Sequence, residues 1–600
     1  MLKRILLPTI LLILAYGFWV SPDFKEIAAG VSIFLFGMLF LEAGFKAFSG
    51  GILEKVLQKT TDKTWKSLCF GIVSTTIMQS SSLVSVITIS FISAGLITLV
   101  AGIGIIFGAN IGTTTGAWLV AAFGLKVKIS AYAMPMLVFG IVLSFQKSRY
   151  LKGIGSVLAG LGFLFLGIHY MKEGFEAFKD SFDLAALAVG GYPGLFLFAG
   201  IGAAATVVMQ SSHATLVLIL TALAVGQITY ENALALAIGA NVGTTITAII
   251  GSLSANVQGK RLAGAHLIFN VVTGVIAILF IGQFVWAVDS FSEAVGIAAD
   301  NYTMKLAVFH TFFNITGVLV MVPLIHRLGD YLHKYFPDQS TDVVEPMYLN
   351  ESAIEFPETV LSSVRKETWN LFDSGFELIA HGMNLHRKQV LGSDDLAKTI
   401  DEDREIHEFD MDDLYASKVK VLYSSIIEFI SLSQSHIPSV FSEELYRLRN
   451  AASEIVESVK HTKHLRKNMS VYMLSDNEDM RKEYNRIRLK LAIIFREIYR
   501  YREEDLENPM AALDLDELKA EASAAKEKLD AEISSLLQSG AITPLMATSL
   551  LNDFNYSDEI ARNLLDCAQA LFASHADLVA EAAQEVILDE EEIESLAKTS

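Results

Sequence analysis

Two short polar motifs lie inside long apolar stretches of the chain. Residues 79–82 read QSSS and residues 210–213 read QSSH. Side-chain amides and hydroxyls both donate and accept hydrogen bonds, so these sets suit an oxyanion or a dehydrated Na⁺. Polar groups at membrane depth must be satisfied by protein or by a water-lined cavity, and helix packing is the alternative explanation. Packing does not require an amide at a repeated position, so binding is the favoured interpretation.

Each polar motif is followed at one spacing by a second motif. GANIGTT occupies residues 108–114 and GANVGTT residues 239–245, so the glutamines and the GAN motifs both recur at an offset of 131. EAGFKAF at 42–48 recurs as KEGFEAF at 172–178, at an offset of 130. Three motifs repeated in register predict a duplicated structural unit.

The elements that carry these motifs are predicted to be membrane helices. The chain is 52% hydrophobic, and its mean hydropathy of +0.42 is high for a soluble protein. Ten apolar segments lie between residues 5 and 325, and the first is interpreted as a retained membrane helix. The predicted fold is all-α and polytopic, with a membrane domain over 1–340 whose repeats cover about 25–150 and 151–330. The segments with the QSS motifs are predicted to be broken or re-entrant helices.

Charged residues predict how the two repeats are oriented. Four lysines lie within residues 55–66, after the first GFKAF, whereas Asp180 and Asp183 follow the equivalent GFEAF. Because basic short loops tend to stay cytoplasmic, equivalent loops prefer opposite sides of the membrane. This pattern predicts inverted repeats that meet near the bilayer midplane, with the N-terminus and the C-terminal half in the cytoplasm.

The motif regions contain no fixed positive charge. The arginines of the membrane half all lie at segment edges, namely Arg4, Arg149, Arg261 and Arg327. Carrying an anion through such a site is easier if cations enter with it, so cation-coupled transport is predicted. This half shows no nucleophile elbow, phosphate-cradling Gly-rich loop or zinc spacing. An enzyme is therefore not predicted, and no cofactor is expected beside Na⁺ as the coupling ion.

The paired motifs resemble those of the sodium-dependent phosphate cotransporter family, which includes the animal type II carriers and bacterial relatives. The resemblance covers about residues 25–330. It implies symport of Na⁺ and inorganic phosphate by alternating access, with phosphate between the two QSS motifs. The residues that it places around phosphate and Na⁺ are Gln79, Ser80, Ser81, Ser82, Gln210, Ser211, Ser212 and His213. The supporting ligands that it implies are Asn110, Thr113, Thr114, Asn241, Thr244 and Thr245.

Histidines mark two further features. His213 breaks the symmetry, because the first motif has a serine at this place. A satisfied interior histidine is the favoured interpretation, and a pH-sensitive phosphate contact is the alternative. The motifs HLIFN at 266–270 and HTFFN at 310–314 each place His and Asn on one helix face. They are predicted to form a structural hydrogen-bond network between their two helices, with ligand binding as the alternative.

The C-terminal half is acidic and helical. After residue 340, roughly 27 Lys and Arg accompany roughly 51 Asp and Glu, so this half accounts for the net charge of −19. That charge disfavours nucleic acid and anionic lipid headgroups as its partners. Apolar residues at three- and four-residue intervals predict a helical bundle over 341–600.

Two stretches of this bundle, 398–415 and 542–571, resemble the PhoU domain, the regulatory module of bacterial phosphate uptake. PhoU domains carry Glu/Asp-x-x-x-Asp motifs associated with metal clusters. Here Glu408 and Asp412 match that motif, whereas Asp553 and Asp558 lie one residue too far apart. A solvated acidic helix face is therefore favoured over a metal site.

These observations predict sodium-coupled transport of inorganic phosphate across the cell (inner) membrane, with a cytoplasmic PhoU-like regulatory domain. Phosphate export and carriage of another small oxyanion stay open, because direction follows gradients. A membrane-tethered phosphate sensor without flux is the alternative of a different class. The expected partners are inorganic phosphate, Na⁺ and the lipid bilayer. A homodimer is left open, and nucleic acid is not expected.

Overall fold

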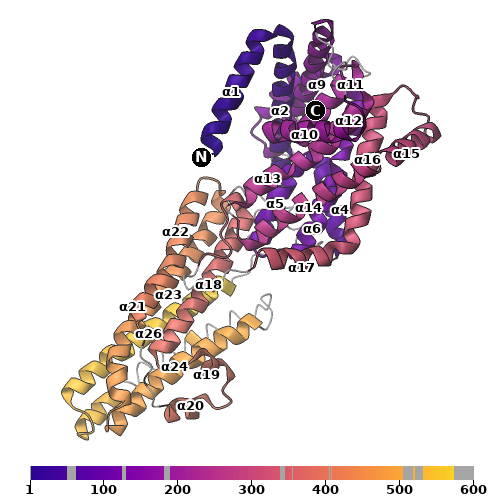
Figure 1. Ribbon diagram of the computed structural model, residues 1–600. Coiled ribbons are helices and arrows are strands. Elements are labelled where there is room, and N and C mark those ends of the chain that lie inside the picture. Colours follow the sequence, from indigo (N-terminus) through magenta and orange to yellow (C-terminus); the bar gives the residue numbers. More distant parts are fainter. Residues whose placement is uncertain are drawn as a thin grey trace. The chain divides into compact units, whose positions relative to one another are not determined.

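The fold is helical throughout the part of the chain that the structure describes. The computed structural model describes residues 2–49, 63–124, 130–181, 189–253, 255–337, 345–354, 356–403, 406, 409–503, 518–519 and 531–572. Every regular element among these residues is a helix (Figure 1). Seven helical spans are long and apolar enough to cross a membrane, which confirms the prediction of an all-α polytopic membrane protein. Contacts divide the chain into two units, Met1–Asp338 and Gln339–Ser600.

The first unit contains both QSS motifs and both GAN motifs. Its helices are α1 Leu2–Val20, α2 Pro22–Ser49, α4 Thr64–Met78, α5 Ser81–Ser93, α6 Leu99–Gly112, α7 Thr114–Leu119, α8 Ser130–Ser144, α9 Arg149–Ser181, α10 Gly191–Met209, α11 Ser212–Ala224, α12 Tyr230–Gly243, α13 Thr245–Ser252, α14 Val257–Leu279, α15 Ile281–Ala294, α16 Tyr302–Met321 and α17 Ile325–Tyr335. The π-helical segment Val120–Gly124 follows α7, and the 3₁₀ turn Val322–Leu324 joins α16 to α17.

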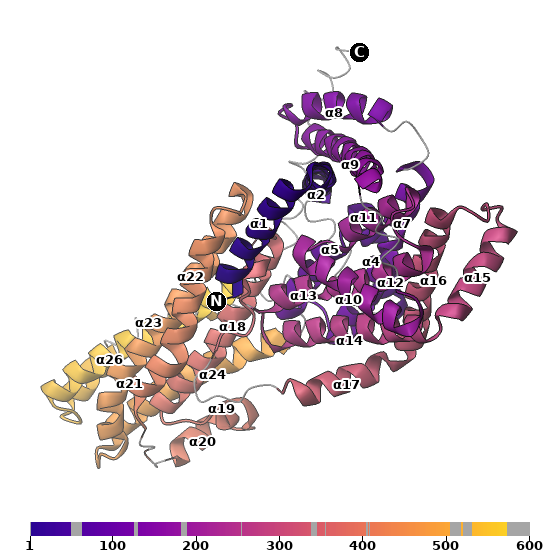
Figure 2. The same cartoon turned by 45° about the horizontal axis from the view of Figure 1, so that its top comes forward.

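Helices α2 and α9, which carry the GFKAF and GFEAF motifs, pack together along glycines spaced seven residues apart (Figure 1). A Cβ atom built on Gly37 would lie only 2.6 Å from the backbone nitrogen of Leu164. The facing glycines are Gly30 with Gly167, Gly37 with Gly160, and Gly44 with Gly153. Numbers rise along α2 as they fall along α9, so these equivalent helices of the two repeats run antiparallel. Helix α8 packs along the other side of the pair, against α9 (Figure 2).

Helices α4 and α5 form a helical hairpin beside α6. Helix α4 runs parallel to α6, because Gly104 lies against Ser67 and Gly112 lies against Thr75. Residues 94–98 join the end of α5 to the start of α6, so α5 returns to the level at which α4 begins. Fifteen helical residues extend about 22 Å, which is less than the ~30 Å of a hydrocarbon core. A hairpin of this length that starts at a membrane surface would have its tip, residues 79–80, within the hydrocarbon core.

Helices α10 and α11 repeat this arrangement beside α12. Gly239 lies against Ala199 and Gly243 against Ala203, so α10 and α12 also run parallel. Five residues, 225–229, join α11 to α12, and the tip of this hairpin is at 210–211. The helix breaks predicted at both QSS motifs are therefore confirmed. The hairpins also interlock, because α5 contacts α13 of the other repeat and α11 contacts α7.

The second unit is built from long amphipathic helices around one apolar core. Phe376 and Phe495 stack at its centre with ring centroids 4.1 Å apart. The fully buried Arg488 pairs with Asp403 at 2.9 Å and donates to three backbone carbonyls. The helices are α18 Pro357–Gly382, α19 Arg387–Gly392, α20 Leu396–Glu402, α21 Met411–Leu414, α22 Val421–Ser433, α23 Ser442–Met473, α24 Glu478–Glu503 and α26 Pro544–Phe572. Short 3₁₀ or π segments are Glu351–Ala353, Tyr415–Lys420 and Ser439–Phe441.

The packing of α2 on α9 can be tested with one added methyl group. We predict that Gly37→Ala lowers the free energy of unfolding by about 1–3 kcal/mol, because its Cβ would meet the backbone of α9. Gly200→Ala is the matched control, since Gly200 lies within α10 with nothing within 4 Å of the added atom. That change should be neutral or stabilise by about 0.5–1 kcal/mol. Thermal unfolding of the detergent-purified chain measures both, and an unchanged melting temperature in Gly37→Ala would contradict the close packing.

Candidate functional site

Each hairpin tip is built around a glutamine with a left-handed backbone. Gln79 has a φ of 53° and Gln210 a φ of 52°. Among the described residues, Asn384 is the one other non-glycine residue with positive φ. This conformation costs about 1–2 kcal/mol in a residue with a Cβ atom, and such residues cluster at ligand sites and switch regions. The same left-handed turn therefore occurs at a glutamine in both repeats.

The serine after each glutamine caps the helix that returns from the tip. The hydroxyl of Ser80 accepts a hydrogen bond from the Leu83 N–H at 3.2 Å, and that of Ser211 accepts one from the Ala214 N–H at 3.1 Å. The first N–H groups of α5 and α11 therefore lie at the tips, beside the last carbonyls of α4 and α10. Such ends offer donors to an anion and oxygen ligands to a cation.

The two glutamine side chains have different surroundings. The Gln79 amide donates to the Thr76 carbonyl at 2.5 Å and to the Thr115 hydroxyl at 3.1 Å. In the second repeat the residue equivalent to Thr115 is Ile246, which has no hydroxyl, and the Gln210 side chain is exposed. Gln79 is thus held in position, whereas the Gln210 amide is accessible to solvent or to a ligand.

The repeats touch each other at two equivalent places near the tips. The hydroxyls of Thr247 of α13 and Ser82 of α5 are hydrogen-bonded, with 3.2 Å between the oxygens, and the Thr247 hydroxyl also contacts the Thr244 carbonyl at 2.8 Å. At the equivalent place, Gly116 of α7 lies against His213 of α11, and a Cβ on Gly116 would lie 1.9 Å from the imidazole Cε1. The offset of 131 relates Ser82 to His213 and Gly116 to Thr247. One contact therefore pairs two hydroxyls, those of Ser82 and Thr247. The equivalent contact pairs the imidazole of His213 with Gly116, which has no side chain.

Gly116 is also the point at which Gln79 and His213 meet. The Cβ position built on Gly116 lies 2.8 Å from Gln79 Oε1 and 2.5 Å from His213 Nδ1. Phe34 of α2 stacks on the imidazole, with 5.7 Å between ring centroids. The residue that breaks the symmetry of the motifs therefore lies between the two repeats, beside the first tip glutamine.

The buried cations of this unit lie elsewhere. Among its described residues, the buried basic side chains are Arg261 and Lys305. Arg261 donates to the Phe336 carbonyl at 2.9 Å, and Lys305 pairs with Asp289 at 2.9 Å. The described part of the tips is thus lined by amides, hydroxyls, one imidazole and backbone groups. These groups can hold an anion and a cation together, but they supply no fixed positive side chain.

One of the predicted supporting ligands contacts a QSS motif. Thr244 donates to the Ser212 hydroxyl at 3.0 Å. Four others donate to backbone carbonyls three or four residues earlier in the chain, namely Thr113 to Asn110, Thr114 to Ile111, Thr245 to Val242, and Asn110 to Ile106. Their role as ligands stays a prediction.

The HTFFN motif forms a buried network with the second GAN motif. Asn241 of α12 donates to Asn314 of α16 at 2.9 Å, and its amide oxygen lies 3.1 Å from His310 Nε2. In the HLIFN motif, Asn270 donates to the carbonyl of His266 within α14. HTFFN therefore belongs to a buried network, but its hydrogen bonds join α16 to α12, so the predicted network between the HLIFN and HTFFN helices is not what these bonds form.

The acidic motifs of the second unit are engaged with cations and a phenol. Glu408 lies outside the described residues, and Asp412 pairs with Lys463 at 2.5 Å. Asp558 pairs with Lys490, while buried Asp553 accepts a hydrogen bond from Tyr484 at 2.6 Å. Burial raises the pKa of the Asp553 carboxyl. The described residues contain no group of three His, Cys, Asp or Glu that could hold a metal ion.

Comparison with known proteins assigns the family. The Na⁺/Pi-cotransporter family model matches residues 33–173 and 195–301, and each matched block contains one QSS and one GAN motif. The chain is 30% identical to the uncharacterised protein YqeW of Bacillus subtilis over 311 residues, which are 51% of this chain and 96% of YqeW. No solved structure shows significant similarity. The chain is a multi-pass membrane protein and belongs to the Na⁺/Pi-cotransporter family.

Relatives provisionally named for inorganic phosphate export are also similar to this chain. YjbB of Escherichia coli K12 is 26% identical over 375 residues, covering 61% of this chain and 67% of YjbB. YjbB of Salmonella typhimurium is 25% identical over 367 residues, covering 60% of this chain and 65% of that protein.

Several residues at the tips carry no motif of their own. Thr115, Gly116, Thr247 and Phe34 contact the QSS residues, but each is an ordinary residue of an apolar helix when taken alone. The signal for two of them is the repeat offset, because an alignment at 131 places Gly116 opposite Thr247 and Ser82 opposite His213. Their contact across the repeats needs the three-dimensional structure.

The Gly116 and His213 pair provides a double-mutant test. We predict that Gly116→Thr destabilises the chain by about 1–3 kcal/mol, because the added side chain would overlap the imidazole. Adding His213→Ser should recover most of that loss. The double variant has a threonine at 116 and a serine at 213, the same hydroxyl pair that Thr247 and Ser82 form at the equivalent contact. Thermal unfolding of wild type, both single variants and the double variant measures the coupling. If the losses of stability in the two single variants simply add in the double variant, the proposed steric coupling of Gly116 and His213 is contradicted.

Proposed function

We propose that this protein carries inorganic phosphate across the cell membrane, coupled to Na⁺, and holds phosphate between the two hairpin tips. Membership of the Na⁺/Pi-cotransporter family supports phosphate as the substrate. The observation that carries the placement is the pair of left-handed glutamines, one at each tip, with Gln79 and His213 meeting across the repeats over Gly116.

The chemistry of the tips supports coupling to a cation. A phosphate ion at these tips meets helix N-termini, hydroxyls and amides, which favour an oxyanion. Its negative charge is not balanced by a lysine or arginine, since the buried basic side chains described in this unit pair elsewhere. Na⁺ ions held by the carbonyl ends of α4 and α10 and by hydroxyls would supply that balance.

The contacts between the repeats support inverted topology and alternating access. Helices α2 and α9 occupy equivalent places in the two repeats and run antiparallel. An offset of 131 residues relates Ser82 to His213 and Gly116 to Thr247. The contact between Ser82 and Thr247 is therefore equivalent to that between His213 and Gly116, as a two-fold relation between the halves requires. Two such halves can expose one central site to either side in turn.

Orientation and regulation complete the proposal. The basic segment 55–66 supports a cytoplasmic N-terminus and second unit, because short basic loops tend to stay inside. The resemblance of the second unit to PhoU supports a regulatory role for it. Export is the second candidate for net direction, and it is favoured by the provisional names of the YjbB relatives.

Flux in proteoliposomes tests this function. We expect phosphate uptake to accelerate when an inward Na⁺ gradient is imposed. Gln79→Ala and Gln210→Ala should each reduce the rate at least tenfold, because each removes an amide from the proposed site. Gln283→Ala, an exposed glutamine of α15, is the matched control and should keep the wild-type rate.

The same experiment separates transport of phosphate from the alternative functions. Phosphate binding without flux would identify a sensor, and faster flux of a competing oxyanion would identify a different cargo. Flux that ignores both Na⁺ and the two tip variants would overturn the proposed site.

A further inference from the structure

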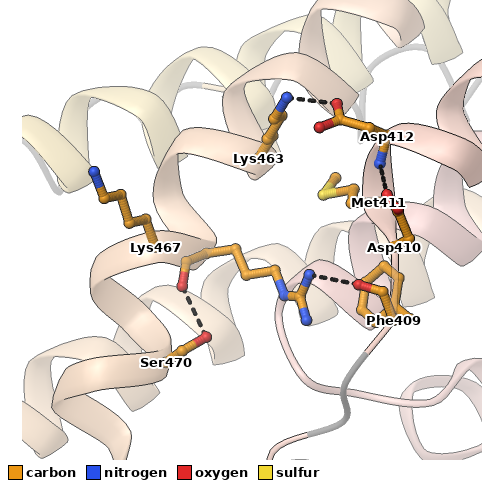
Figure 3. A pocket seen from close by; sticks show the side chains of 8 residues that line it. Phe409, Asp410, Met411, Asp412, Lys463, Lys467 and Ser470 are labelled. Atoms are coloured by element: carbon orange, nitrogen blue, oxygen red, sulfur yellow. Dashed lines mark hydrogen bonds and ion pairs between the residues drawn. The ribbon is translucent and has the colours of Figure 1, made fainter.

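The second unit contains a pocket that is separate from the hairpin tips. Its volume is about 770 Å³, which is within the range of small-molecule sites. It lies between the start of α21 and one face of α23 (Figure 3). The residues that line it are Phe409, Asp410, Met411, Asp412, Lys463, Arg466, Lys467 and Ser470.

The wall formed by α23 is basic, although the unit as a whole is acidic. Lys463, Arg466 and Lys467 are spaced three and four residues apart, so one helix face presents all three cations to the pocket. Asp410 and Asp412 on the opposite wall carry two negative charges. The described lining therefore has a net positive charge, which favours an anion.

Both acidic side chains of the pocket form hydrogen bonds or ion pairs, whereas the three basic side chains differ in their partners. Asp410 accepts hydrogen bonds from the backbone N–H groups of Asp412 and Asp413 and so caps α21. Asp412 pairs with Lys463 at 2.5 Å (Figure 3). Both members of that pair are solvent-exposed, so the pair contributes little to stability and can exchange.

Arg466 and Lys467 complete the wall in different ways. Arg466 donates to the Phe409 carbonyl at 3.2 Å, and its guanidinium lies 4.0 Å from the centre of the Phe409 ring, so it is held in position. Lys467 is exposed at the pocket and makes no hydrogen bond or ion pair with any described residue. The pocket thus combines one fixed planar cation with two lysines that can move onto a ligand.

We propose that this pocket binds a small phosphate-bearing anion, with Lys467 and Lys463 on the phosphate oxygens and Arg466 beside them. Binding draws Lys463 away from Asp412, because a phosphate group with a charge near −2 competes with a single exposed carboxylate. The ligand is either inorganic phosphate or a nucleotide, which share this chemistry. A regulatory role for the ligand depends on the proposed transport function, whereas the binding itself does not.

An anion site and a metal site respond in opposite ways to loss of Asp412. Removal of its carboxylate adds net positive charge to the pocket and frees Lys463, so an anion should bind more tightly. The same change would remove a ligand from a cation and weaken its binding. Asp412→Asn therefore decides the sign of the charge that the pocket accepts.

Calorimetric titration of the full chain in detergent micelles tests the proposal, with ATP and inorganic phosphate as separate probes. Lys467→Glu should weaken binding of at least one probe by about tenfold or more, and Asp412→Asn should strengthen binding of that probe by about two- to fivefold. Lys482→Glu, the same charge change at an exposed lysine of α24, should change it less than twofold. Equal melting temperatures of the variants verify that they fold.

The outcomes also identify the ligand. If Lys467→Glu loses ATP binding but keeps phosphate binding, the ligand is a nucleotide. Phosphate binding at the pocket is measured in a Gln79→Ala background, which removes an amide from the proposed transport site. If Lys467→Glu abolishes that remaining phosphate binding, the ligand is inorganic phosphate. The proposal is overturned if neither probe depends on Lys467, if Lys482→Glu has the same effect, or if Asp412→Asn weakens binding. Failed flux in proteoliposomes with intact Lys467-dependent binding would remove the transport proposal and leave this one standing.

Discussion

The left-handed turn at Gln79 and Gln210 is the constraint on which the membrane unit depends. A backbone that reverses within the depth of a bilayer exposes N–H and C=O groups that lipid cannot satisfy, so protein or a ligand must surround it. The structure provides this cover by packing α4 and α10 against α6 and α12 through glycines and by interlocking the hairpins of the two repeats. The unpaired N–H and C=O groups at the helix ends make the turn unfavourable in lipid, and the same groups can bind ions.

Duplication supplies two such tips, and the side-chain contacts of the two tips differ. The Gln79 side chain is tied to Thr115, whereas Ile246 removes that tie from Gln210. The hydroxyl pair of Ser82 and Thr247 is replaced by the imidazole of His213 over Gly116. A carrier needs two halves that are alike enough to exchange roles, and these paired substitutions let the halves differ without a steric conflict.

The sequence predicted the hairpins and the all-helical fold because both leave local signals. Hydropathy marks the helices, and a repeated glutamine amid apolar residues marks each break. The partners of the tips could not be predicted, because Gly116 and Thr247 are unremarkable until the α7 to α11 and α13 to α5 contacts form. For the same reason the HTFFN network was expected to reach α14 and instead reaches Asn241. In the second unit, the Glu408 and Asp412 motif was interpreted as a solvated acidic helix face, with a metal site as the alternative, and the facing lysines of α23 lie more than fifty positions away from it in the sequence.

The central claim is that the anion lies between the two tips. Arsenate has the shape and charge of phosphate, and its anomalous scattering locates it in a crystal of the Na⁺-loaded protein. The account predicts an arsenic peak within hydrogen-bonding reach of the Gln79 and Gln210 amides, close to Gly116, and loss of that peak in Gln79→Ala. An arsenic site elsewhere in the membrane unit, with the tips unchanged, would contradict it.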